Sequence, residues 1–227
     1  MADDIGRITR RVIEVISEWD PLGGPDRWPD ARFDLLAGEI FAHQYARNDA
    51  YRSFCDGRNV TPAVVDEYRD VPAVPTDAFK HVRLTTTSDP ARTFRTSGTT
   101  TGDRGEHHFG TLEVYRASLE PPFRRFCMPD RDSIRMLVVA PSANALPDSS
   151  LSFMLSELFE DFATPESEFL VERDDEGTLD LRLDALRNAL DRAEADGEPV
   201  FLLGTAFGFV ELFDSTDASW SLPDGSR

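Results

Sequence analysis

Apolar residues recur every three or four positions along the first part of the chain, a spacing typical of amphipathic helices. This spacing predicts a helix over residues 4–19 and a second helix near residues 32–48. Thr61 followed by Pro62 predicts the start of a short third helix, because a capping residue before a first-turn proline favours helix initiation. Residues 71–75 are punctuated by proline and are expected to be extended.

From about residue 92 the pattern changes to short apolar runs that alternate with amphipathic stretches. The nearly continuous run over residues 134–140 is typical of a strand in a buried parallel sheet. The alternation predicts strands over residues 93–95, 134–140, 169–171 and 200–203, and helices over residues 111–126, 149–161, 180–195 and 206–214. Such an order implies a mostly parallel, doubly wound sheet. We therefore predict an α/β fold, with an N-terminal helical segment over residues 1–90 and an α/β subdomain over residues 91–227.

Composition narrows the class of protein. A chain of 227 residues can form one large domain or two small ones, and its net charge of −18 argues against general binding to nucleic acids or anionic membranes. Cys55 and Cys127 are too few for a metal cluster or a disulfide framework, so a reduced cytoplasm is the simplest setting. The N-terminus lacks the pattern of a signal peptide, and no run approaches the roughly 18 apolar residues that span a bilayer.

The stretch most informative about chemistry combines hydroxyl and glycine residues directly after a predicted strand. It consists of Thr96, Ser97, Gly98, Thr99, Thr100, Thr101 and Gly102, and Arg104 follows. Glycine lets the backbone approach a ligand closely, and successive N–H groups with hydroxyl donors form a nest for an anion. It is not a Walker-type P-loop, because Asp103 stands where that motif has Lys. The stretch predicts a phosphate-binding loop, with an ordinary Ser/Thr/Gly turn as the alternative.

The loop resembles the Thr-Ser-Gly-Thr-Thr-Gly phosphate-binding signature of adenylate-forming enzymes. It has one extra threonine, and Arg104 lies near the place where those enzymes often have Lys. Further segments look like the acyl-protein synthetase branch, the LuxE type that activates fatty acids: residues 74–80, 140–142, 149–151, 202–207 and 222–227. The resemblance runs from about Phe33 to the last residue.

This resemblance implies that a carboxylic acid, in particular a fatty acid, is activated with ATP as an acyl adenylate and then transferred to a thiol. In that scheme residues 96–102 and Arg104 hold the β- and γ-phosphates of ATP, with Mg²⁺ bridging phosphate oxygens. The implied partners are ATP, the acid and an acyl-accepting protein. Because family members are longer, the resemblance also implies an incomplete α/β subdomain that does not complete adenylation alone and that associates with a missing C-terminal part or a second copy.

Lys80 and His107 are the candidates outside the loop in this part of the chain. Lys80, the one lysine of the sequence, matches a Lys of the family pattern and would contact a phosphate or a carboxylate as a point charge; an ordinary surface lysine is the alternative. His107 is a candidate for lining the ligand site, with a structural histidine as the alternative. His107 and His108 are expected on opposite faces of a strand and therefore not to share a metal ion. The resemblance also implies an acyl-accepting Cys, but we interpret Cys127 as inert, because that Cys lies near the end of a longer chain.

Ser142 and Gly204 lie at predicted strand ends, and Ser149 lies at a predicted helix start that could face the same crevice. Because ligands of open α/β sheets bind at the carboxyl ends of strands, these residues are candidates for substrate binding, with a helix cap as the alternative for Ser149. Phenylalanine-rich segments such as residues 201–213 offer material for an acyl pocket. Two other functions stay open: a non-catalytic module that binds a nucleotide or a partner, and a coenzyme A ligase similar to phenylacetate–coenzyme A ligases.

Overall fold

The computed structural model describes residues 2–19, 30–96 and 103–227. The chain forms two compact units, Met1–Cys127 and Met128–Arg227. The predicted division into segments 1–90 and 91–227 follows the texture of the sequence and stays a prediction.

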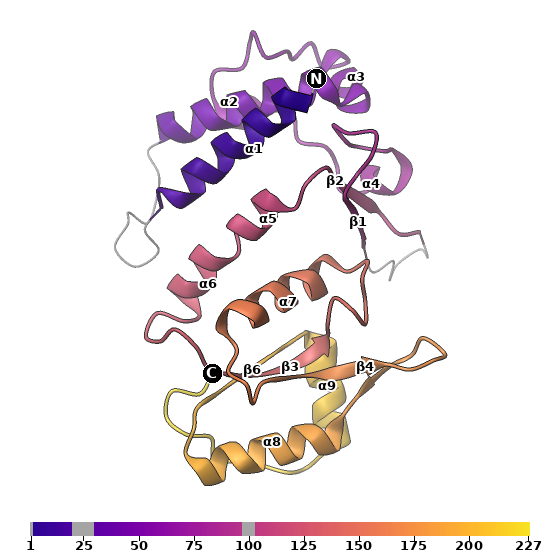
Figure 1. The fold of residues 1–227 in the computed structure, drawn as a ribbon. Coiled ribbons are helices and arrows are strands. Elements are labelled where there is room, and N and C mark those ends of the chain that lie inside the picture. The colour runs from indigo at the N-terminus through magenta and orange to yellow at the C-terminus, as the bar shows by residue number, and fades with distance from the viewer. Residues whose placement is uncertain (1, 20–29, 97–102) are drawn as a thin grey trace. The chain divides into compact units, whose positions relative to one another are not determined.

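Helices dominate the first unit (Figure 1). They are α1 (Ala2–Ser17), α2 (Asp30–Arg47), α3 (Asp49–Asp56), a 3₁₀ turn η1 (Tyr68–Asp70), α4 (Ala78–His81), α5 (Glu113–Ala117) and α6 (Glu120–Phe126). The chain turns sharply between α2 and α3 because the Asn48 side chain caps α3, accepting a hydrogen bond from the Tyr51 N–H at 3.1 Å. Phe41, Tyr51 and Cys55 form the core between these two helices.

The helices predicted over residues 4–19 and 32–48 are confirmed as α1 and α2. The helix predicted to start at Thr61 is wrong. Its residues make a single turn, closed by the Val64 N–H on the Thr61 carbonyl oxygen at 3.1 Å. Val64 and Val65 are both β-branched, and such residues disfavour extension of a helix.

The single helix predicted over residues 111–126 is also wrong in its continuity, because α5 and α6 are separated at residues 118–119. Pro121 and Pro122 lack the N–H groups that an uninterrupted helix needs. They fit the first turn of α6, where those N–H groups would have no partner within the helix.

Strands β1 (Arg92–Arg95) and β2 (Glu106–Phe109) form a two-stranded sheet of their own. They pair antiparallel, with Phe94 opposite His107. The strand predicted over residues 93–95 is confirmed, but the expectation that it joins the parallel sheet is wrong. Residues 96–105 are too short a connection for a parallel crossover, which needs a dozen or more residues, so the two strands form a hairpin.

The second unit is a four-stranded sheet with helices on both faces. Its strands are β3 (Arg135–Pro141), β4 (Glu168–Arg173), β5 (Leu179–Leu181) and β6 (Val200–Gly204), in the order β5-β4-β3-β6. β3 pairs parallel with β4 and with β6, and only β5 is antiparallel. Figure 1 shows α7 (Ser150–Phe162) on one face and α8 (Leu183–Asp196) and α9 (Ala206–Ser215) on the other. The predicted α/β class with a mostly parallel sheet is thus confirmed.

Burial in the second unit follows from this layering. Residues 135–140 of β3 are all buried, as a strand covered on both faces requires. Leu137 and Val139 pack with Leu186 and Leu190 of α8 and with Leu212 of α9. The helix predicted over residues 180–195 begins later, at Leu183, because residues 174–178 make a tight turn that pairs β5 with β4.

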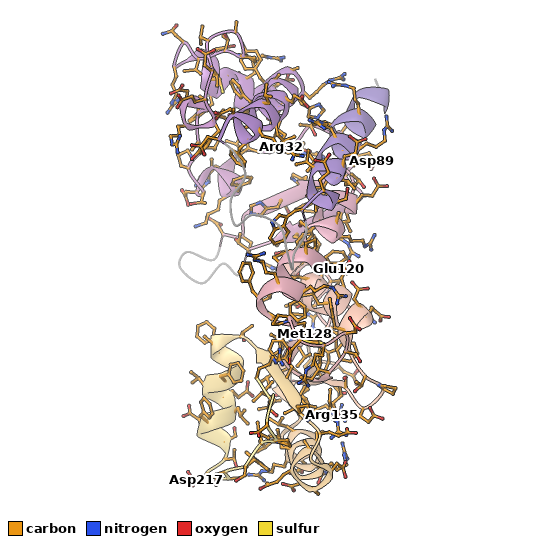
Figure 2. The ribbon with its side chains drawn as sticks, turned by 90° about the vertical axis from the view of Figure 1, so that its left-hand side faces the viewer. Arg32, Asp89, Glu120, Met128, Arg135 and Asp217 are labelled. Carbon is orange, nitrogen blue, oxygen red and sulfur yellow. The ribbon has the colours of Figure 1, made fainter. Side chains whose placement is uncertain are left out.

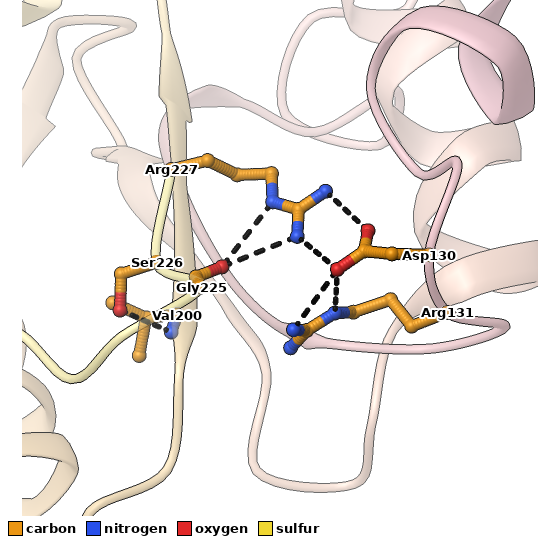
Figure 3. Close-up of polar contacts among 6 residues, drawn as sticks. All are labelled: Asp130, Arg131, Val200, Gly225, Ser226 and Arg227. Carbon is orange, nitrogen blue, oxygen red and sulfur yellow. Dashed lines mark hydrogen bonds and ion pairs between the residues drawn. The ribbon is translucent and has the colours of Figure 1, made fainter.

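Charged residues lie near the amino end of β3. Arg135, labelled in Figure 2, is buried and donates from Nη2 to Glu198 at 2.7 Å. Arg227 pairs with β6 through its backbone: its N–H donates to the Val200 carbonyl oxygen at 2.9 Å, and its own carbonyl oxygen accepts from the Leu202 N–H at 2.8 Å. Its guanidinium donates to both carboxylate oxygens of Asp130, at 2.9 and 3.0 Å (Figure 3). These contacts tie residues 225–227 to the edge of the sheet.

Candidate functional site

The predicted phosphate loop begins at the end of β1. Ser97, Gly98, Thr99, Thr100, Thr101 and Gly102 lie outside the described residues. The structure does describe Thr96 and Arg104, which flank them.

The base of the loop is held by hydrogen bonds between its two ends. The Thr96 N–H donates to the Gly105 carbonyl oxygen at 3.0 Å, and the Gly105 N–H donates to Thr96 Oγ1 at 2.8 Å. Arg104 Nε donates to the Thr96 carbonyl oxygen at 2.7 Å. The two chain ends therefore lie side by side, and the exposed Arg104 guanidinium is fixed at this base.

Helix α4 packs on the same hairpin. The rings of Phe79 and His107 stack with their centroids 4.4 Å apart and their planes at 29°. Gly105 lies against this stack, since a Cβ there would meet Phe79 Cβ and Thr96 Cγ2 at 3.4 Å. The structure thus brings together the segment that carries Lys80, the base of the loop and His107, which sequence spacing alone does not link.

Lys80 lies in α4 with its side chain three-quarters buried, and its Nζ is 3.2 Å from Asp77 Oδ1. Hydrogen bonds from Lys80 first, and from His81, hold the pKa of Asp77 below its usual value. Asp77 thus stays ionised and positions the ammonium at the first turn of α4. A role of Lys80 in binding a phosphate or a carboxylate stays a prediction.

His108 has different surroundings from His107. Its Nδ1 is 3.0 Å from Thr93 Oγ1, and its Nε2 is 3.6 Å from Glu106. His107 and His108 are adjacent in β2 and contact different neighbours, as expected for side chains that alternate between the two faces of a strand. His107 takes part in the contact between α4 and the loop base, whereas His108 contacts residues of the hairpin itself.

An apolar cavity of about 510 Å³ lies in the first unit. Its lining comes from α2, α3, η1 and the segment up to Leu84: Phe33, Leu36, Ala37, Ile40, Phe41, Gln44, Asn48, Tyr51, Tyr68, Val71, Val74, Phe79 and Leu84. The apolar spacing of α2 predicts a buried face, but it cannot show that the partner surface leaves space. The sequence interpretation therefore missed this cavity and offered residues 201–213 instead. There, Phe207 and Phe213 of α9 are 81% and 71% exposed, and the cavity beside Phe213 measures about 150 Å³.

Ser142, Ser149 and Gly204 lie in the second unit, at the carboxyl edge of its sheet. Ser149 is the N-cap of α7, where its side chain accepts from the Ser152 N–H at 3.1 Å. Ser142 Oγ accepts from the Ala145 N–H at 3.3 Å. Both hydroxyls thus bind their own backbone. Substrate binding by any of the three residues stays a prediction.

Close packing explains why glycine occupies position 204. A Cβ there would lie 2.7 Å from the Val139 carbonyl oxygen, and a Cβ on Gly208 would lie 2.5 Å from the same atom. The start of α9 therefore packs directly on the backbone of β3. In the sheet, β4 lies on one side of β3 and β6 lies on the other. The strand order therefore reverses between β3 and β6, and ligands of open α/β sheets bind at such points.

In the described ranges 2–19, 30–96 and 103–227, no helix has the length and apolar character needed to cross a membrane. In the same ranges, no group of three or more His, Cys, Asp and Glu side chains gathers in a way that would hold a metal ion.

The family model of acyl-protein synthetases, LuxE, matches residues 26–217. The match includes the cavity, the hydroxyl-rich loop and the parallel sheet, and the chain belongs to this family. No curated protein and no solved structure matches the chain significantly.

Proposed function

We propose that this protein activates a carboxylic acid with ATP as an acyl adenylate, in the manner of adenylate-forming enzymes, and passes the acyl group to a thiol of an acceptor protein. The name of its family supports the transfer of an acyl group to a protein. The observation that supports the use of ATP is the base of the 96–105 loop, where Arg104 and Gly105 donate hydrogen bonds to Thr96, and a run of hydroxyl and glycine residues follows Thr96 in the sequence.

The donor set suits a triphosphate. Hydroxyl groups, glycine N–H groups and a guanidinium all donate hydrogen bonds to anionic oxygens, and the run contains no carboxylate before Asp103. A phosphate-bound Mg²⁺ keeps several waters and needs one or two carboxylates rather than a protein cage. Residues 96–102 and Arg104 would hold the β- and γ-phosphates.

In the first step, a carboxylate oxygen of the acid attacks the α-phosphorus of ATP, and the bond from that phosphorus to pyrophosphate breaks. Negative charge then grows on the pyrophosphate, where the loop donors and Arg104 would stabilise it. In the second step, the thiolate of the acceptor attacks the acyl carbon, and AMP leaves with the electron pair of the broken C–O bond. Lys80, near the loop base through α4, would contact the carboxylate or a phosphate as a point charge.

The test combines ATP binding with exchange of labelled pyrophosphate into ATP in the presence of a fatty acid. Replacing both Thr99 and Thr100 by Val removes two donors and roughly keeps the shape of the side chains. At about 1.5–3 kcal/mol for each hydrogen bond to a charged group, affinity for ATP should fall at least about tenfold. Thr178→Val, at an exposed hydroxyl of the β4–β5 turn, is the control and should change nothing.

Unchanged ATP binding in the double variant would return the loop to an ordinary turn. ATP binding without pyrophosphate exchange would instead support a module that binds a nucleotide without turning it over. Exchange followed by acyl transfer to free coenzyme A, but not to a protein, would favour a coenzyme A ligase.

A further inference from the structure

The cavity of the first unit has an elongated wall. Its α2 side is one stripe of the helix, formed by Phe33, Leu36, Ala37, Ile40, Phe41 and Gln44. These residues follow each other at helical spacing, so the stripe extends about 16 Å at 1.5 Å per residue. An apolar wall of this length fits a linear aliphatic chain better than a compact ring.

Two polar groups of the opposite wall are bonded to the protein itself. The Tyr51 hydroxyl donates to the Pro72 carbonyl oxygen at 2.9 Å, and burial raises the pKa of Tyr51, which keeps it neutral. Asn48 is engaged as the cap of α3. The remaining lining residues of this wall include the aliphatic side chains Val71, Val74 and Leu84. The wall therefore presents mostly carbon and favours a ligand that needs few hydrogen bonds.

One residue connects this cavity with the loop. Phe79 lines the cavity and also stacks on His107 at 4.4 Å, beside Gly105 at the loop base. A ligand that fills the cavity and ends at Phe79 therefore ends next to the segment that we assign to phosphate binding.

We propose that this cavity binds the aliphatic chain of the acid substrate, with the carboxyl end toward Phe79. This inference rests on the proposed function for its choice of ligand. The volume of about 510 Å³ lies within the range of ligand pockets, about 300–1,000 Å³. Each additional methylene of the ligand that enters the cavity should raise affinity about fourfold until the cavity is full.

The experiment measures equilibrium binding of saturated fatty acids, from octanoic to hexadecanoic acid, to the full chain without ATP. Ala37→Phe adds a ring inside the cavity from the α2 stripe. Ala42→Phe, on an exposed position of the same helix outside the lining, makes the same chemical change and is the matched control. Circular dichroism and the thermal unfolding midpoint check that each variant is folded, and Ala37→Leu is the smaller substitution if Ala37→Phe does not fold.

We expect Ala37→Phe to weaken hexadecanoic acid at least about tenfold and octanoic acid much less, because only the long chain needs the filled space. Ala42→Phe should bind the whole series like the parent chain. Equal affinities of both folded variants for hexadecanoic acid would overturn the inference, as would an affinity that does not rise with chain length.

The two proposals fail in different ways. If chain-length dependence and its loss in Ala37→Phe are observed but no pyrophosphate exchange occurs, the cavity assignment stands and this chain alone does not carry out the proposed function. If exchange occurs and Ala37→Phe leaves its dependence on chain length unchanged, the proposed function stands and the acyl chain binds elsewhere.

Discussion

The two units of this chain both contain apolar helix faces, but these faces are packed to different extents. In the second unit, helices cover both faces of a parallel sheet, and residues 135–140 of its central strand are all buried. In the first unit, α2 packs against shorter elements around an apolar cavity of about 510 Å³. Packing thus fills the centre of the sheet in the second unit, whereas the helices of the first unit leave an apolar cavity between them. This difference is why we propose the first unit as the binding place of the acyl chain.

The largest expected effect is a difference between two identical truncations. Leu137→Ala, in the packed centre of β3, should lower the free energy of unfolding by about 3–5 kcal/mol, because a rigid core cannot fill the space left behind. Leu36→Ala, in the wall of the existing cavity, should cost only about 1 kcal/mol, because part of that side chain already faces open space. Urea denaturation measures both. Equal costs would contradict the contrast between the units.

A second pair compares glycines. Gly208→Ala should lower the free energy of unfolding by about 1–3 kcal/mol, because the added Cβ would lie 2.5 Å from the Val139 carbonyl oxygen. Gly38→Ala in α2 should instead raise it by about 0.5–1 kcal/mol, since a Cβ there meets nothing within 4 Å and alanine favours a helix. Thermal denaturation gives the two signs, and a stabilised Gly208→Ala variant would show that β3 and α9 are not tightly packed.

The smallest effect concerns pH. Hydrogen bonds from Arg227 first, and also from Arg131, lower the pKa of Asp130 to about 2 from an ordinary value of 3.8. Because the pKa is lower in the folded state, the pair stabilises the second unit above about pH 4, and this stabilisation is lost as the pH falls toward 2. Asp130→Asn should therefore lower the Tm slightly at pH 7 and by less at pH 2. Asp175→Asn, at an exposed turn, is the control and should leave the Tm unchanged at both pH values. If Asp130→Asn lowers the Tm equally at both pH values, the ion pair does not explain the loss of stability.

The same contrast explains what the sequence could predict. The run over residues 134–140 has one structural solution, a strand covered on both faces, and β3 is that strand. The strand over residues 93–95 was wrongly expected in the parallel sheet, because strand periodicity does not show which strand is the neighbour. The short 96–105 connection does show it, since a parallel crossover needs a dozen or more residues. The break between α5 and α6 was readable from Pro121 and Pro122.

The candidate site was predictable only in part. The family could be predicted from residue types, and the family match confirms it, whereas phosphate binding by the hydroxyl-rich loop stays a prediction. The stack of Phe79 on His107 joins residues far apart in the sequence, and no local pattern indicates it. The cavity depends on how completely two apolar surfaces fill the space between them, which only the packed structure shows.

Photolabelling with a hexadecanoic acid that carries a diazirine on its chain tests most directly where the acid binds. The labelled chain would be digested and the modified peptides identified by mass spectrometry, with unlabelled hexadecanoic acid as competitor. We expect competed labels on peptides of residues 33–84, and their loss in Ala37→Phe but not in Ala42→Phe. Competed labels confined to residues 128–227, and unchanged in Ala37→Phe, would contradict it.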